Sequence, residues 1–243
     1  MTSTMPAAPQ TSIILVPGFW LGAWAWDEVC THLTAAGIRN VAMTLPGLDA
    51  QDPERTTRTV HDQADAIRSA IAEAGGDVVL VAHSGANAPV SLVLDRDPQR
   101  IRRVVWVDSG PLASGAAGAP GLPHTVVELP LPEFEALAQQ ASLEGLSSEQ
   151  LDRFRARAIT QPASAAREQL ELSDDARYAI PTTVICCSMP SVQVLELARS
   201  GHPMFAELAR LAEVELVDVP TGHWPMWSRP RELAEAIAAA ATR

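Results

Sequence analysis

The chain has 243 residues, a net charge of −11 at pH 7 and an isoelectric point near 4.9. This acidic balance argues against nucleic-acid partners and anionic membrane surfaces, because both require a field of lysine and arginine. With 47% apolar and 19% charged residues, the composition is that of a globular domain and not of a disordered chain. We therefore expect a small-molecule substrate, no nucleic-acid partner and no membrane partner. The sequence leaves the oligomeric state open, with a homodimer as one alternative.

Residues 1–10, MTSTMPAAPQ, lack both the basic start and the apolar stretch of a signal peptide, so we interpret them as a loose tail. No later run approaches the length that spans a bilayer. The three cysteines are Cys30, Cys186 and Cys187, and the adjacent pair would point to opposite faces of a strand instead of chelating a metal. We expect a cytoplasmic protein without a metal site or cofactor.

Strand-like and helix-like patterns alternate along most of the chain. Short β-branched or continuously apolar runs predict strands at 12–16, 39–44, 77–82, 101–107, 182–187 and 214–219. Apolar residues at helical spacing predict helices at 24–36, 57–74, 86–96, 191–199 and 230–241. Alternation of this kind predicts an α/β protein with a mostly parallel sheet of about six strands and helices on both faces.

The alternation breaks between Gly110 and Ile180, where a proline-rich loop leads into short helical patterns. Ser147 and Gln150 have the spacing of a capping box before one of these patterns. We expect a core formed by residues 11–110 and 181–243, with a small helical lid inserted at 111–180.

The stretch VVLVAHSGANA, residues 78–88, places Ser84 between a buried strand and a helix. A nucleophile in such a sharp turn needs very small residues two positions before and after it, and these positions hold Ala82 and Ala86. The usual G-x-S-x-G pattern thus appears as A-x-S-x-A. The alternative is that Ser84 only caps the following helix.

A second candidate for the chemistry is His223, in TGHWPMWSRP after the last predicted strand. A loop at the carboxyl edge of the sheet can bring an imidazole within reach of the serine as a general base. The other five histidines have no such setting. In VPGFWLGAWAW, residues 16–26, the Phe19 N–H is a candidate oxyanion donor together with the Gly85 N–H. The alternative for this segment is a glycine turn followed by tryptophans that pack in the core.

Three segments resemble one group of the α/β-hydrolase fold, the plant methyl esterases and hydroxynitrile lyases. PGFWLGAWAW is similar to the group's H-G-x-x-x-G-x-W-x-W segment, and GHWPMWSRP is similar to its D-H-x-P-M-x-S-x-P segment. VVWVDSGPL resembles the strand and loop before its lid. The resemblance implies an α/β-hydrolase fold, cofactor-independent esterase activity, Ser84 as nucleophile, His223 as base, and an oxyanion hole at Phe19 and Gly85.

Two positions depart from that group. Its third triad member is an aspartate soon after the strand that corresponds to 182–187, yet residues 188–195 contain no carboxylate at the expected place. Some α/β-hydrolases place the acid after the preceding strand, where this chain has Asp108, which we favour. Glu196 and Asp218 remain as alternatives. The second departure is Pro17, where the group often has histidine.

The leading hypothesis is a serine hydrolase that cleaves a small hydrophobic carboxylic ester through an acyl-enzyme. We expect Gly18, Trp20, His83 and Trp224 to form the substrate pocket with Phe19 and the lid. A hydroxynitrile lyase is less favoured, because the resemblance then requires threonine at position 18 and lysine at position 224. The alternative from another class is a binding protein that retains the pocket without hydrolysis, which an absent acid would favour.

Overall fold

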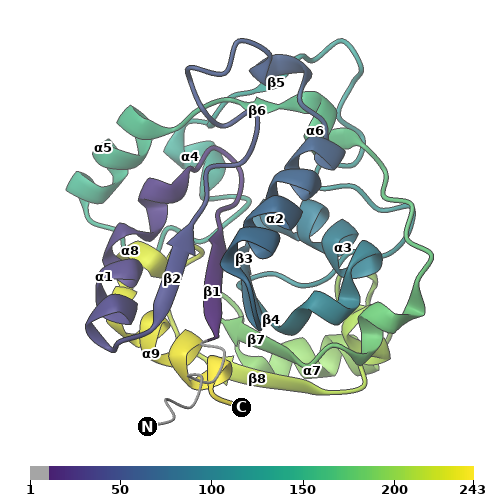
Figure 1. Cartoon of the computed structure of the whole chain (residues 1–243). Helices are drawn as coiled ribbons and strands as arrows, with labels where there is room; N and C mark the ends of the chain where they lie inside the picture. The colour runs from purple at the N-terminus through teal and green to yellow at the C-terminus, as the bar shows by residue number, and fades with distance from the viewer. Residues whose placement is uncertain (1–10) are drawn as a thin grey trace, which may run out of the picture.

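The computed structural model describes residues 11–243, so the tail predicted for residues 1–10 lies outside it. Its centre is a six-stranded sheet in the order β2-β1-β3-β4-β7-β8, in which every neighbouring pair is parallel (Figure 1). The strands are β1 (Ser12–Val16), β2 (Arg39–Ala42), β3 (Val78–His83), β4 (Ile101–Val107), β7 (Thr182–Cys186) and β8 (Val214–Asp218). The α/β class and the parallel sheet predicted from the sequence are confirmed.

The inner strands are apolar on both faces because both faces are covered by helices. Along β1, Ile13 and Leu15 pack into one core, while Ile14 and Val16 pack into the other. Successive side chains of a strand point to opposite faces, so one uninterrupted apolar run supplies both cores. The edge strands β2 and β8 are only partly buried.

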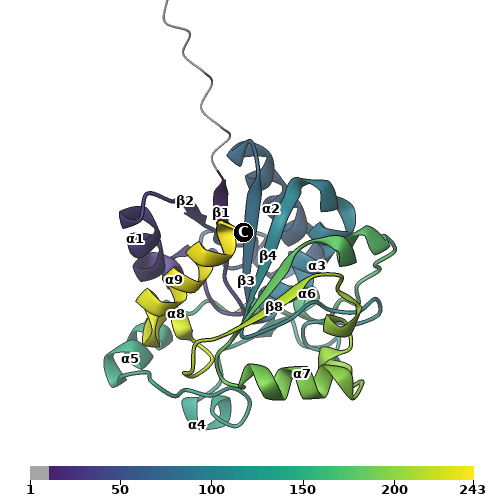
Figure 2. The ribbon, with the colours of Figure 1, turned by 90° about the horizontal axis from the view of Figure 1, so that it is seen from below.

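Two sets of helices cover the sheet (Figure 2). The helices α1 (Asp27–Ala35), α8 (Pro225–Ser228) and α9 (Pro230–Ala241) pack on one face. The other face holds α2 (Val60–Ala74), α3 (Asn87–Arg96) and α7 (Ser191–Arg199). Ala23–Trp26 forms a separate 3₁₀ turn before α1, where the sequence predicts one helix from residue 24. Within residues 11–243, no helix combines the length and the apolar character needed to cross a membrane.

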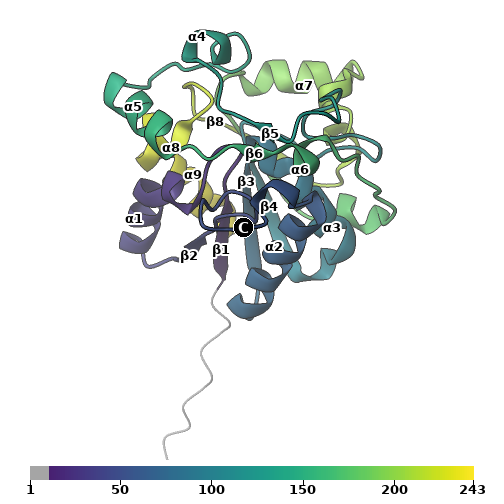
Figure 3. The same ribbon diagram turned by 90° about the horizontal axis from the view of Figure 1, so that it is seen from above.

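The segment 111–180, here called the insertion, lies between β4 and β7. It contains β5 (Glu128–Leu129), α4 (Phe134–Leu137), α5 (Ser148–Arg157), β6 (Gln161–Pro162) and α6 (Ala163–Arg167). Helix α5 begins with the predicted capping box, in which the Ser147 hydroxyl accepts from Gln150 N–H and the Gln150 side chain accepts from Ser147 N–H. Figure 3 shows the insertion lying across the carboxyl ends of the sheet strands.

Candidate active site

Ser84 stands in a strained turn directly after β3. Its φ is +50°, in the left-handed region that residues other than glycine seldom adopt. The chain turns from β3 through the short 3₁₀ segment Ser84–Ala86 into α3, and Ala82 and Ala86 are 0% and 1% exposed. On the other side, a Cβ atom added to Gly18 would lie 2.9 Å from Ser84 Cβ. Small residues are therefore required around Ser84, and its side chain is held at the carboxyl end of the sheet.

Ser84, His223 and Asp108 form one chain of hydrogen bonds. Ser84 Oγ lies 2.8 Å from His223 Nε2, and His223 Nδ1 lies 2.6 Å from Asp108 Oδ2. The three residues come from three separate places, namely the turn after β3, the residue after β4 and the loop between β8 and α8. The structure thus brings together the three side chains that the sequence predicts as a triad.

Asp108 is held as an ionised acceptor. Its Oδ2 accepts from the Ser188 hydroxyl at 2.6 Å, and its Oδ1 accepts from Ser188 N–H at 2.9 Å and Cys187 N–H at 3.1 Å. Burial alone would raise the pKa of Asp108, but the hydrogen bonds and the charge of His223 outweigh it and lower the pKa to about 2. An ionised carboxylate can only accept, so the proton of His223 lies on Nδ1 and Nε2 is free to accept from Ser84.

Phe19 and Gly85 border the cavity next to Ser84. In the described part of the chain, the Phe19 N–H has no hydrogen-bond partner, which leaves it available to a ligand. The Phe19 ring lies directly over Gly85, where an added Cβ atom would come within 2.4 Å of the ring. The same ring would be 3.0 Å from a Cβ atom on Gly118 of the insertion. Phe19 therefore occupies a slot that two glycines leave open.

The cavity beside Ser84 has a volume of about 400 Å³ and a predominantly apolar lining. It reaches from the triad to helix α7 and to the turn at Pro203–Phe205. Its apolar walls include Phe19, Leu112, Val184, Met189, Val194 and Phe205. The volume and lining are those of a site for a small hydrophobic molecule.

Residues 13–236 match the model of the alpha/beta hydrolase family. The chain belongs to this family. A carbendazim hydrolyzing esterase from a Nocardioides species is 28% identical over 249 residues, covering 95% of this chain and 99% of that protein. Methyl jasmonate esterase 1 of Vitis vinifera is 33% identical over 104 residues, covering 41% of this chain and 40% of that protein. Relatives named hydrolases and esterases thus place this chain among the esterase-type enzymes of the family.

Solved structures show the same fold. An extracellular α/β-hydrolase from a Paenibacillus species has a TM-score of 0.75 at 20% identity, covering 96% of this chain and 99% of that chain. An Arabidopsis methylesterase has a TM-score of 0.70 at 17% identity, with the same coverage. Together with the sequence similarity to methyl jasmonate esterase 1, this shared fold confirms the resemblance to the plant methyl esterase group.

Four residues predicted for the substrate pocket of this α/β-hydrolase do not line the cavity. Gly18 packs beneath Ser84, and His83 and Trp224 are only 1% and 2% exposed. The Trp20 indole donates to the carbonyl oxygen of Leu129. Trp20 and Trp224 pack against the insertion instead. Gly18 and His83 pack against the Ser84 turn and the His223 loop, so a role of the four in substrate binding stays a prediction. The cavity walls from α7 and from residues 203–205 were not predictable from the sequence, since no motif marks them.

His83 instead supports the histidine loop. Its Nε2–H donates to the carbonyl oxygen of His223 at 2.7 Å, and the two rings lie 4.8 Å apart. Burial and, to a smaller extent, the nearby His223 lower the pKa of His83 to about 3, so the ring is neutral at pH 7. A neutral ring with its proton on Nε2 can make this bond.

The alternative carboxylates do not reach His223. Glu196 is exposed on α7, and Asp218 accepts instead from the N–H and the hydroxyl of Ser191. Cys186 also borders the cavity, but burial raises the pKa of its thiol to about 12, so it is not a thiolate near pH 7. Within residues 11–243, no three His, Cys, Asp or Glu side chains gather in a cluster that could hold a metal ion.

Proposed function

We propose that this enzyme is a serine hydrolase that cleaves a small hydrophobic carboxylic ester. The observation that carries the proposal is the hydrogen-bonded chain from Ser84 Oγ through His223 to Asp108 at the edge of an apolar cavity. A serine hydroxyl is a weak nucleophile unless an adjacent base removes its proton, and this geometry supplies both the base and the carboxylate that orients it.

In the proposed reaction, His223 Nε2 takes the proton of Ser84 while Ser84 Oγ attacks the ester carbonyl carbon. The negative charge that forms on the carbonyl oxygen is stabilised by the N–H groups of Phe19 and Gly85. His223 then donates the proton to the leaving alcohol, and an acyl-enzyme remains on Ser84. Water, deprotonated by His223, attacks this acyl group and releases the acid.

Asp108 orients His223 and stabilises the imidazolium that forms during attack. The apolar walls favour esters with a compact hydrophobic group over charged or extended substrates. The relatives support an ester bond as the target, since their names include methylesterases and a pyrethroid hydrolase.

The alternatives find less support at this site. A binding protein without hydrolysis does not need an aligned Ser-His-Asp chain. The absence of an acid would have favoured it, but the Asp108 carboxylate lies within hydrogen-bond distance of His223. For a hydroxynitrile lyase, threonine at position 18 would clash, because even its Cβ atom would lie 2.9 Å from Ser84 Cβ and from the His83 carbonyl oxygen. Position 224 holds a buried tryptophan in place of lysine.

The decisive experiment is hydrolysis of short-chain p-nitrophenyl esters by wild type and Ser84→Ala. We expect kcat to fall by about 10⁴-fold or more, with an unchanged circular dichroism spectrum, because the nucleophile alone is removed. Ser69→Ala, on the exposed side of α2, is the matched control and should keep the wild-type rate. A fluorophosphonate probe should label the peptide that contains Ser84. Full activity in Ser84→Ala would overturn the proposal.

A further inference from the structure

Trp20 has a backbone conformation that a tryptophan rarely adopts. Leu21 N–H donates to the Gly18 carbonyl oxygen across a turn in which Phe19 and Trp20 are the central residues. The φ of Trp20 is +67°, and turns with a positive φ at this third position usually have glycine or asparagine there. A bulky residue persists in this region only when its surroundings hold it.

The insertion supplies the groups that hold Trp20. The indole Nε1–H donates to the Leu129 carbonyl oxygen at 3.0 Å, and Ile159 N–H donates to the Trp20 carbonyl oxygen at 3.0 Å. Leu129 is the last residue of β5, and Ile159 lies between α5 and β6. The side chain and the backbone of one residue are thus bound to two separate parts of the insertion.

The insertion also holds the loop of the catalytic histidine. Gly222 N–H donates to the Glu144 carbonyl oxygen at 3.1 Å, and His223 N–H donates to the Ser142 carbonyl oxygen at 2.8 Å. The approach is so close that a Cβ atom on Gly222 would lie 2.6 Å from both carbonyl oxygens. The insertion therefore fixes two loops that carry groups of the proposed site.

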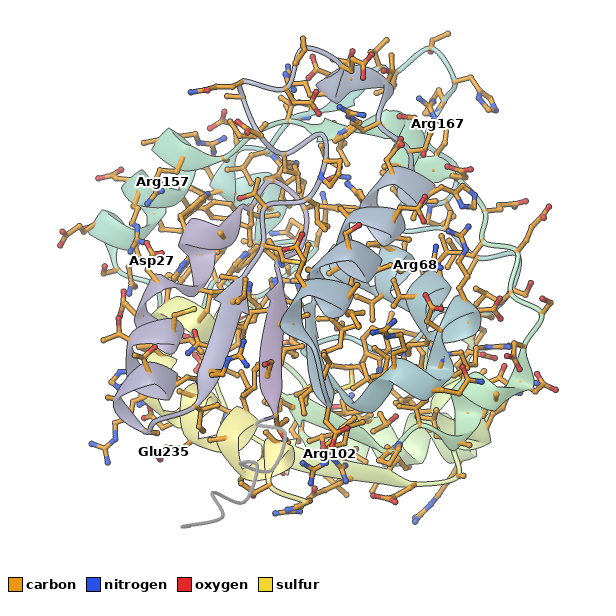
Figure 4. All side chains as sticks on the ribbon, in the orientation of Figure 1. Asp27, Arg68, Arg102, Arg157, Arg167 and Glu235 are labelled. Carbon is orange, nitrogen blue, oxygen red and sulfur yellow. The ribbon has the colours of Figure 1, made fainter. Side chains whose placement is uncertain are left out.

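Contacts outside the cavity anchor the same insertion to the core. Figure 4 shows Arg157 of α5 beside Asp27 of α1, and their charged groups lie 3.9 Å apart. Arg153 lies 3.2 Å from the same carboxylate and also donates to the Trp24 carbonyl oxygen. The insertion is thus bound at its outer side as well as at the two loops.

We infer that Trp20 is a positioning residue, through which the insertion fixes the turn that carries the Phe19 N–H. Trp20 is bonded directly to Phe19, so a shift of Trp20 reorients the adjacent peptide groups of the turn. The insertion then acts as a structural part of the site and not only as a cover. This inference rests on the proposed function, since it assigns the Phe19 N–H to the oxyanion.

The test compares Trp20→Phe with Trp24→Phe, which lies in the same loop. Trp20→Phe keeps an aromatic ring and removes the indole N–H that binds Leu129. Trp24→Phe is the matched control, because in the described chain the Trp24 indole N–H has no hydrogen-bond partner and its ring stacks on Trp227. A misplaced catalytic group can cost about a hundredfold in rate, so we expect Trp20→Phe to lower kcat by about 10- to 100-fold.

A positioning role predicts a specific set of kinetic constants. KM should stay within about twofold for Trp20→Phe, because the substrate walls do not include Trp20. Inhibition by a trifluoromethyl ketone, which forms an oxyanion on Ser84, should weaken in parallel with kcat/KM. Trp24→Phe should retain the wild-type constants. A wild-type kcat for Trp20→Phe, a rise in KM alone, or equal losses in both variants would overturn the inference.

Hydrogen–deuterium exchange separates this inference from the proposed function. Trp20→Phe should increase the exchange of peptides covering residues 17–22 and 127–131 relative to Trp24→Phe. If wild type has no Ser84-dependent esterase activity, the proposed function fails. In that case, unchanged exchange in Trp20→Phe would also show that Trp20 does not hold the turn. If wild type is active and only the Trp20→Phe results are negative, the inference alone fails.

Discussion

Two aspartates at the carboxyl edge of the sheet have nearly the same hydrogen bonds but different neighbours. Asp108 accepts from Ser188 N–H at 2.9 Å and from its hydroxyl at 2.6 Å. Asp218 accepts from Ser191 N–H at 2.7 Å and from its hydroxyl at 2.6 Å. Only Asp108 also receives the Nδ1–H of His223. A carboxylate that holds a serine is therefore not sufficient to identify the triad acid.

The strand order explains the difference. Asp108 follows β4, which is the direct neighbour of β3 and its Ser84, whereas Asp218 ends β8, three places from β3 in the sheet. Asp108 has a φ of +45°, so the chain bends sharply where β4 ends. The Asp108 side chain is only 7% exposed. Asp218 is an exposed residue, and its carboxylate binds Ser191 at the start of α7. The place of Asp108 next to β3 and Ser84, together with its burial, makes it the candidate acid.

Replacing each aspartate with asparagine tests the difference between Asp108 and Asp218 most directly. Asp108→Asn keeps the shape of the side chain but removes the charge that fixes the His223 tautomer. The corresponding change in a serine protease lowers kcat by about 10⁴-fold, and we expect a loss of at least about a hundredfold here. The measurement is kcat and KM for a p-nitrophenyl ester, with the Tm as a check on folding.

Asp218→Asn is the matched control for this prediction. It alters the contact with Ser191 and should leave kcat within about twofold, because Asp218 makes no contact with the triad. The comparison would be reversed if Asp218→Asn were inactive while Asp108→Asn stayed within a few-fold of wild type. Equal losses in both variants would indicate damage to the sheet edge and not the loss of one acid.

Acid denaturation tests the ionisation of Asp108 through a smaller effect, on stability. The pKa of Asp108 is lowered from 3.8 to about 2 in the folded state, so its carboxylate stabilises the fold fully above about pH 4. This contribution, about 2 kcal/mol, is lost as the pH falls from about 4 to 2. Urea unfolding of wild type should therefore lose about 2 kcal/mol more than that of Asp108→Asn between pH 5 and pH 2. Parallel losses in the two proteins would contradict the lowered pKa.

The sequence predicts most of the sheet because the buried strands are continuous apolar runs. The predicted bounds of β1, β4, α7 and α9 agree with the structure. The predicted helix at 24–36 is divided, since Ala23–Trp26 forms a 3₁₀ turn in which Trp26 and Ala25 are buried. Helix α8 is missed because four residues are too few to show a helical period.

The site could be predicted where topology determines position. Ser84 and Asp108 follow adjacent strands, so their proximity follows from the alternating pattern of the chain. The pocket walls could not be predicted in this way, because the directions of Trp20 and Trp224 depend on contacts with the insertion, such as Leu129 with the indole of Trp20. The catalytic roles of the triad and of the oxyanion donors stay predictions for the experiments above.

Replacing the serines that bind the two aspartates should change kcat less than replacing the aspartates themselves. The Ser188 hydroxyl donates to Asp108 Oδ2, the same oxygen that accepts His223 Nδ1–H. Ser188→Ala leaves the two N–H donors on Oδ1, so Asp108 stays in place but loses one support for its charge. Such a bond contributes about 1.5–3 kcal/mol to stability, but only the part that changes in the transition state affects kcat.

We therefore expect Ser188→Ala to lower kcat by about two- to tenfold, with KM unchanged. The acid-induced loss of stability should also be smaller and should end at a higher pH, because one of the bonds that lower the pKa of Asp108 in the folded state is removed. Ser191→Ala is the matched change at Asp218, and should reduce the stability measured in urea while leaving kcat at the wild-type value. If both serine variants lowered kcat equally, the two aspartates would not differ in the way that the His223 contact implies. If Ser188→Ala changed neither kcat nor the acid transition, its hydroxyl would not support the charge of Asp108.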